Sequence, residues 1–419
     1  MSTLFALPVS ILLLATFSLA ESETKESKNA EESSALFESD EEGSATAEVS
    51  ESLTMMAKAF RAIFGDNDVK SRVGERLANE YLERGHLREA VEIANEVSDY
   101  RQALINCDIA TAAFKAGESE VFESSVRNAT EFSRFKLPWE GERIRARLSA
   151  VYTAAGNEKK SKELFDSLKK PRERLYAEAW IAREKALRGE EWSMESEAEE
   201  AAKQSMLQSL NPDLLRVSEA LIDISRNLVE TGGEQNADKA LKLLEQAEEF
   251  AVRSRVSTML IALKTTQVRW QAGLKEETEP YFSKLEDAME KTTPSADWTY
   301  EWMLELYTGA VDRGDTAMAG RGVRNLERFA VGSLSMHQPN VLSAKARVQY
   351  KLGEKDSAIE TWKRALEIAN ENPNHRNRVR TCFRIALDHH EEGIQFAKEL
   401  KKAWETTLEE ALALYKESS

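Results

Sequence analysis

The chain has 419 residues, more than a single hydrophobic core of ordinary size, so it forms either several globular domains or an elongated array of repeats. Its 73 acidic residues outnumber its 57 lysines and arginines. The resulting net charge of −16 argues against general nucleic-acid binding, which needs a basic surface. Abundant Ala, Leu, Glu, Lys and Arg and only eight prolines favour an all-helical repeat array.

Residues 1–20 have the character of a secretory signal peptide. They contain no charged side chain, include an apolar run from Ile11 to Leu14, and end in small residues at Ala20, where we expect cleavage. The usual basic residue before the apolar run is missing. The alternative is an uncleaved anchor and a membrane-tethered protein, but the apolar stretch is short for a bilayer span and contains Pro8. We therefore expect an exported protein, periplasmic or extracellular.

Residues 21–52 consist mainly of Ser, Glu and Ala. They contain eleven acidic residues and two lysines, so more than half of the net negative charge of the chain lies in this segment. Such a composition offers almost no large apolar side chain to bury, which predicts an acidic disordered tether. The acidity of the chain is therefore mainly a property of this segment.

Residues 53–68 contain the pattern of a short amphipathic helix. Leu53, Met56 and Phe60 share one side of this helix, and Lys58 and Arg61 lie opposite. We interpret the segment as a cap over the exposed face of the first repeat, because repeat arrays need covered ends. A helix that binds a membrane surface or a partner protein is the alternative.

The clearest repeat unit runs from Val341 to Pro373. An apolar stripe at helical spacing precedes Gly353, which is suited to closing a helix in the left-handed conformation. A second helix then carries Ala358, Trp362 and Ala365 on one face before Pro373 ends it. This pattern predicts two short antiparallel helices with small residues at their close approach.

Similar glycines recur every 32 to 44 residues, a spacing typical of helical hairpin repeats. The nine positions are Gly85, Gly117, Gly156, Gly189, Gly233, Gly273, Gly314, Gly353 and Gly393. Six prolines separate successive units, as expected if helix interiors exclude proline: Pro138, Pro171, Pro212, Pro294, Pro339 and Pro373. Pro280 fits the first turn of a second helix, behind Thr278.

The first unit places Leu77, Ala78, Tyr81, Gly85 and Ala90 in the pattern of the tetratricopeptide repeat, and three other units follow it closely. The chain thus resembles tetratricopeptide-repeat proteins over residues 69–374, although the units in the middle depart from the pattern. The resemblance implies an all-α fold, a right-handed α-solenoid of about nine helix-turn-helix repeats with capping helices. Residues 375–419 would form the last hairpin and the C-terminal capping helix.

The sequence lacks the standard signatures of catalysis. It has no Gly-x-Ser-x-Gly nucleophile motif and no zinc-type spacing of Cys or His, so we expect no enzyme activity, no metal and no cofactor. The run from His389 to Glu392 is the one concentration of potential metal ligands, and we interpret it as solvated helix surface. Cys107 and Cys382 are expected to be buried and too far apart to bond.

One set of polar residues is a candidate binding strip, if the first helices of the repeats share a concave face. Its members are Arg72, Arg76 and Asn79 in the first unit, Arg143 and Arg147 in the third, and Arg183 in the fourth. Tetratricopeptide grooves that hold a peptide carboxylate use Lys and Asn at related places, so the resemblance suggests an acidic or C-terminal peptide ligand. The alternative is that these arginines pair with acids on neighbouring helices.

These patterns together predict an exported, non-catalytic scaffold that binds a protein or peptide and no nucleic acid. A long surface of stacked helices suits this role, because every repeat contributes a few contacts. The alternative from another class is an enzyme built on a helical array that acts on polysaccharide or peptidoglycan. Such an enzyme would group acidic and aromatic side chains in one cleft, and the sequence singles out no such group.

Overall fold

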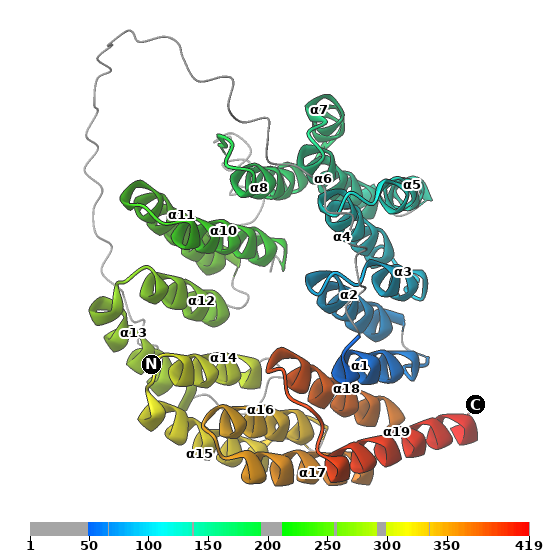
Figure 1. The fold of residues 1–419 in the computed structure, drawn as a ribbon, viewed down its shortest axis with the longest axis vertical. Helices are drawn as coiled ribbons and strands as arrows, with labels where there is room; N and C mark the ends of the chain where they lie inside the picture. The colour runs from blue at the N-terminus through cyan, green and yellow to red at the C-terminus, as the bar shows by residue number, and fades with distance from the viewer. Residues whose placement is uncertain are drawn as a thin grey trace, which may run out of the picture. The chain divides into compact units, whose positions relative to one another are not determined.

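The computed structural model describes residues 49–65, 67–135, 138–193, 212–254, 258–290, 299–334 and 336–418. Among these residues it contains eighteen α-helices and no strand (Figure 1), so the chain is an all-α solenoid as predicted. The expected signal peptide and nearly all of the expected acidic tether lie outside the described residues, as does Pro294.

The bounds of the helices, in chain order, are α1 (Glu51–Arg61), α2 (Asn67–Glu83), α3 (Leu87–Asn95), α4 (Arg101–Lys115), α5 (Ser119–Phe135), α6 (Pro138–Ala154), α7 (Glu158–Asp166), α8 (Pro171–Leu187), α10 (Pro212–Thr231), α11 (Glu234–Ser254), α12 (Thr258–Gln271), α13 (Lys275–Glu290), α14 (Thr299–Asp312), α15 (Thr316–Gly332), α16 (Gln338–Lys351), α17 (Lys355–Glu371), α18 (His375–Glu391) and α19 (Lys398–Ser418). After the leading helix α1, first and second members of a hairpin alternate along the described residues, except that α8 is followed by α10, the next first helix, because residues 194–211 lie outside the described residues.

The nine predicted glycines all follow the first helix of a hairpin. Their φ angles lie between 63° and 94°, in the left-handed region that glycine adopts without steric cost. A Cβ atom added at any of them would meet no atom within 4 Å. The requirement for glycine is therefore conformational and not a matter of space, which explains why the sequence alone located these turns.

Proline positions agree with the predicted boundaries except at one place. Pro138, Pro171 and Pro212 are the first residues of α6, α8 and α10. The prediction for Pro280 was wrong, because this residue lies inside α13 and not in its first turn. Thr278 does not cap the helix, since its hydroxyl donates to the carbonyls of Leu274 and Lys275 in a turn that is already helical.

First helices contact successive first helices, and the contact of α8 with α10 continues the series. The second helices pack on their own first helix and, in most units, on the next one. Ala358, Trp362 and Ala365 of the clearest repeat unit have no exposed surface, which places them in the packed core. Cys107 and Cys382 are likewise buried and free, and burial raises the pKa of both thiols.

The helix α1 covers the first hairpin, as a cap would, but it also packs on the last one. It contacts α18 more extensively than α2. Its Phe60 is wholly buried and lies against Gly74 of α2. Beyond its end, Phe64 stacks on Tyr415 of α19 with ring centroids 4.5 Å apart. A single apolar cluster accordingly includes residues of both the first and the last hairpins. The two ends expected to be capped separately are joined through α1.

The predicted element at residues 53–68 is divided in the structure. The helix α1 begins two residues earlier, behind the Ser50 side chain that accepts a hydrogen bond from the Leu53 amide, and it ends at Arg61. The next helix, α2, already begins at Asn67. Among the helices of the described residues, none combines the length and the apolar character that a bilayer span requires.

Candidate functional site

The predicted arginine strip does not form one open surface. Arg143 has a side chain only 3% exposed, and its guanidinium makes a bidentate contact with Glu173 at 2.6 and 3.1 Å. Arg147 donates to Asp108, and its guanidinium lies 3.3 Å from the ring centre of Trp180. These two side chains therefore hold α4, α6 and α8 together, and their role toward a ligand stays a prediction.

The remaining strip residues keep more contact with solvent. Arg183 lies 2.8 Å from Glu184 and 3.6 Å from Asp223. On α2, Arg72 is 67% exposed and lies 3.0 Å from Asp68, while Asn79 is half-buried. Arg76 also has an acidic neighbour, so all five arginines of the predicted strip lie beside a carboxylate. Of the strip residues, only those on α2 lie near the last hairpin.

Arg76 reaches across from α2 to α18. It contacts Glu80 on its own helix at 2.7 Å and donates to Glu391 of the last hairpin. Its partner Glu80 is nearly buried, and the other carboxylate oxygen of Glu80 lies 3.4 Å from Nε2 of His390. A polar junction, defined by Arg76, Glu80, His390 and Glu391, therefore links the first and last hairpins.

The prediction that His389 to Glu392 form solvated surface was wrong for both histidines. His389 is 1% exposed and His390 is 4% exposed, because α18 is surrounded by α1, α16, α17 and α19. The ring of His389 stacks on Phe396 at 4.0 Å, and its Nδ1 lies 2.8 Å from the Ile385 carbonyl oxygen. Burial lowers the pKa of His389, which favours the neutral ring with Nδ1–H as donor.

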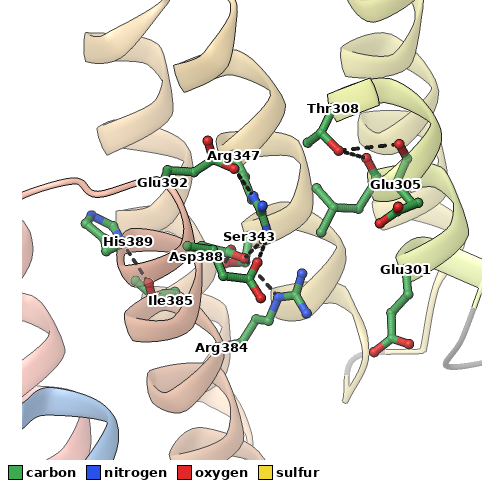
Figure 2. A network of polar contacts seen from close by, with 12 residues as sticks. Glu301, Glu305, Thr308, Ser343, Arg347, Arg384, Ile385, Asp388, His389 and Glu392 are labelled. Carbon is green, nitrogen blue, oxygen red and sulfur yellow. Dashed lines mark hydrogen bonds and ion pairs between the residues drawn. The ribbon is translucent and has the colours of Figure 1, made fainter. Parts of the chain in front are cut away.

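The turn of α18 beside these histidines contains a buried carboxylate, shown in Figure 2. Asp388 has no exposed surface, and one of its oxygens accepts a hydrogen bond from the Ser343 hydroxyl at 2.6 Å. Its other oxygen lies 3.1 Å from Nε of Arg384. Ser343 in turn accepts from the Trp362 indole at 3.2 Å. Asp388 thereby holds Arg384 at a fixed place on α18.

Arg347 of α16 completes this network. Its Nε lies 2.5 Å from Glu392, it also donates to Glu391, and its Nη1 lies 3.9 Å from Asp388. Burial lowers the pKa of Arg347, but the three carboxylates outweigh it and raise the pKa overall. Removing one member of such a buried set costs about 3–5 kcal/mol, because the others stay buried without compensation. The network therefore fixes α18 against α16.

Another part of the α18 surface borders a pocket of about 380 Å³. We call it the arginine pocket. It is lined by Arg72, Val73, Tyr300, Glu301, Met336, His337, Asn340, Asn377, Arg380, Phe383, Arg384 and Leu387. Three guanidinium groups face one carboxylate among these residues. The pocket also lies at the first turns of α14, α16 and α18, where helix dipoles favour negative charge.

The three arginines of the pocket differ in how they are held. Arg384 is anchored by Asp388 and lies 5.8 Å from the ring centre of Tyr300. Arg72 shares Asp68 with Arg101, which is 3.2 Å from the same carboxylate. Arg380 is exposed, and among the described residues it has no ion-pair partner. A negatively charged ligand would therefore find one guanidinium fixed and another available.

A larger pocket of about 840 Å³ lies beside α7, α8 and α11, but its charges balance. It is lined by four glutamates and four lysines: Glu158, Glu178, Glu190, Glu191, Lys162, Lys185, Lys239 and Lys242. The arginine pocket is the better candidate because its lining has a clear excess of one charge. Within the described part of the chain, no group of three or more His, Cys, Asp or Glu side chains is arranged to hold a metal ion.

A regular spacing of arginines in the sequence could have indicated this pocket, although it is not part of the repeat pattern. Arg376, Arg380 and Arg384 are spaced by four residues, which places them on one face of α18. Only Arg72 belongs both to the predicted strip and to the pocket. Arg72 lines one pocket with α18 residues only because the first and last hairpins meet, which no local pattern indicates.

No protein-family model matches the sequence, and no curated protein matches it. Two solved structures resemble parts of the fold weakly. One is a circular tandem repeat protein with a novel repeat topology and enhanced subunit contact surfaces; it is 14% identical, with 87% of this chain and 95% of that chain covered and a TM-score of 0.26. The other is Ton1535 from Thermococcus onnurineus NA1, 15% identical, with 81% and 98% covered and a TM-score of 0.31. Such low TM-scores bear on neither fold nor function.

Proposed function

We propose that the chain is an exported, non-catalytic scaffold of tetratricopeptide-like hairpins that binds an acidic segment of another protein in the arginine pocket. The observation that carries the proposal is the pocket itself, where Arg72, Arg380 and Arg384 face a single carboxylate, Glu301. Guanidinium groups bind carboxylates with paired, charge-assisted hydrogen bonds. A side chain of aspartate or glutamate is small enough to enter the pocket, and such binding requires no covalent chemistry.

The tetratricopeptide assignment rests on the small, aromatic and small positions of the second helices and on the glycine turns. Export rests on residues 1–20 of the sequence alone, and N-terminal sequencing of the mature protein tests it. A mature chain that begins at residue 21 supports export by cleavage. A mature chain that retains residues 1–20 supports the membrane-tethered scaffold instead.

The alternative, an enzyme that acts on polysaccharide or peptidoglycan, would need a different lining. Glycoside hydrolysis generally uses two carboxyl groups that flank the scissile bond. The arginine pocket is lined by Glu301 alone among the carboxylates of the described residues, beside three arginines that would attract anions instead. Turnover of a purified glycan by the protein without any partner would favour the enzyme and reject the scaffold.

The scaffold is tested by comparative affinity capture from an envelope extract of the source organism. The full mature chain serves as bait in three forms: unchanged, Arg380→Glu, and Arg88→Glu. Arg88 is exposed on α3 and lies outside the pocket, so it controls for a general change of surface charge. We expect one protein to be recovered with the unchanged and Arg88→Glu baits and lost with Arg380→Glu. Equal recovery with all three baits would reject the pocket as the binding site.

A further inference from the structure

An exposed apolar patch borders the arginine pocket. The described residues include seven exposed large apolar side chains, and three of them fall between positions 331 and 336. They are Val331, which is 70% exposed, Leu334, which is 65% exposed, and Met336, which is 41% exposed. Scattered single apolar residues are ordinary on protein surfaces, whereas a local concentration marks an interaction site. We call these three residues the α15–α16 patch.

Met336 and Leu334 connect the patch to the pocket, because the Leu334 carbonyl accepts a hydrogen bond from the amide of His337 at 2.8 Å. The Met336 side chain lines the pocket, beside His337 at the start of α16. The inner wall also contains the apolar side chains of Phe383 and Leu387, each less than a tenth exposed. A ligand with its charged group among the arginines would therefore lie against apolar surface on one side.

We propose that the binding partner contributes an acidic peptide segment with a large apolar side chain close to its carboxylates. The carboxylates enter the arginine pocket, and the apolar side chain packs on the α15–α16 patch. This inference rests on the proposed function and specifies its ligand. Arg380 is the primary contact because it has no ion-pair partner among the described residues, so its binding to a carboxylate displaces no internal acid.

A peptide fits these features better than an anionic membrane does. The pocket is concave and of a size that admits individual side chains, whereas a bilayer presents a broad surface. The net charge of −16 also opposes adsorption of the chain to anionic lipid. A peptide needs only local charge complementarity, which the three arginines supply.

The experiment is a selection from a displayed library of random twelve-residue peptides against the full mature chain. We expect the enriched peptides to combine Asp or Glu with a nearby Leu, Ile, Phe or Met. A synthetic peptide of the consensus is then titrated by fluorescence anisotropy. Arg380→Glu and Leu334→Ser should each weaken its binding by about tenfold, the equivalent of one good contact. Both residues are exposed, so neither change disturbs the core.

Two matched variants serve as controls. Arg88→Glu makes the same charge change on α3, and Val252→Ser removes an apolar side chain that is 65% exposed on α11. Both should bind the consensus peptide as tightly as the unchanged protein. A second peptide, with its apolar residue replaced by serine, should bind more weakly to the unchanged protein and should not respond to Leu334→Ser.

The outcomes separate this inference from the proposed function. One result would overturn the inference but leave the acidic-ligand scaffold in place. In that result the enriched peptides are acidic without an apolar residue, and their binding is weakened by Arg380→Glu but not by Leu334→Ser. Enriched peptides without acids, unaffected by Arg380→Glu, would overturn both. A selection that enriches no peptide, together with binding to anionic phospholipid vesicles that is lost in Leu334→Ser, would indicate that the patch binds a membrane. This result would also overturn the inference.

Discussion

At the scale of single residues, two neighbouring buried groups of α18 lie in opposite surroundings. Asp388 lies beside arginines and accepts a hydrogen bond from Ser343, whereas His389 is surrounded by aromatic rings. The two neighbours in sequence therefore meet opposite requirements. Asp388 is held beside cations, and a positive charge on His389 would be poorly solvated among Trp362 and Phe396.

Because His389 is buried, we expect the protein to lose stability in mild acid. Burial lowers the pKa of His389 in the folded protein, so the unfolded chain binds more protons below about pH 6.5, the ordinary histidine pKa. The contribution of His389 to the free energy of unfolding is therefore complete above that pH. It declines as the pH falls toward the lowered pKa of His389 in the folded protein. Urea unfolding between pH 7.5 and 5 should show this decline, and His389→Phe should reduce it.

The control for this prediction is Cys382→Ala, on the same helix. Burial raises the pKa of the Cys382 thiol further above this pH range, so its replacement should lower the stability equally at every pH and leave the pH dependence of unfolding unchanged. An identical pH dependence for the unchanged protein and His389→Phe would show that the imidazole of His389 does not govern the acid response.

At the scale of helices, small residues set how closely the members of a hairpin approach. Two glycines of α15, Gly320 and Gly322, lie on different sides of the helix. A Cβ atom added at Gly322 would lie 2.2 Å from the ring of Tyr307 on α14, whereas one added at Gly320 would meet nothing within 4 Å. Tyr307 is wholly buried, and its hydroxyl accepts a hydrogen bond of 2.9 Å from the Asn325 amide. The ring therefore has little room to move away from an added methyl group. Gly322 is thus required by packing, unlike the turn glycines.

The two glycines predict opposite effects of the same substitution. Gly322→Ala should destabilise the protein by about 1–3 kcal/mol, since Tyr307 or the helix must shift. Gly320→Ala should stabilise it by about 0.5–1 kcal/mol, because alanine loses less conformational freedom in a helix. Urea unfolding followed by tryptophan fluorescence measures both. If Gly322→Ala were as stable as Gly320→Ala, the tight contact of α14 with α15 would be refuted.

At the scale of the whole molecule, contacts between the first and last hairpins distinguish this protein from an array with two free ends. The helix α1 supplies the apolar part of that contact, and Arg76, Glu80, His390 and Glu391 supply the polar part. Arg376 adds a hydrogen bond of 2.7 Å to the carbonyl oxygen of Gly65. The arginine pocket depends on the same meeting, since Arg72 and Arg380 come from opposite ends of the chain.

Phe60→Ala tests this coupling of the two ends. The side chain is wholly buried against Gly74 of α2, so its removal should cost about 3–5 kcal/mol of local stability and loosen α1, the helix that contacts α18. Hydrogen exchange should therefore accelerate in α18 and α19 as well as in α1 and α2. A matched truncation, Phe282→Ala in α13, should accelerate exchange in its own neighbourhood and leave α18 unaffected. Acceleration confined to α1 and α2 after Phe60→Ala would mean that α1 does not stabilise the last hairpin.

The sequence by itself determined the helical hairpins of this protein and their turns, because helix periodicity and a glycine with positive φ are local properties. Gly353 and Ala358 show this: the turn and the small residue at the start of the second helix follow from the pattern within one hairpin. Only the tertiary structure decided that His389 and His390 are buried and that Arg72 and Arg380 line the same pocket. The Ser52 hydroxyl that lies 3.5 Å from His390 is 338 residues away in the chain, and no local pattern encodes a contact over that separation.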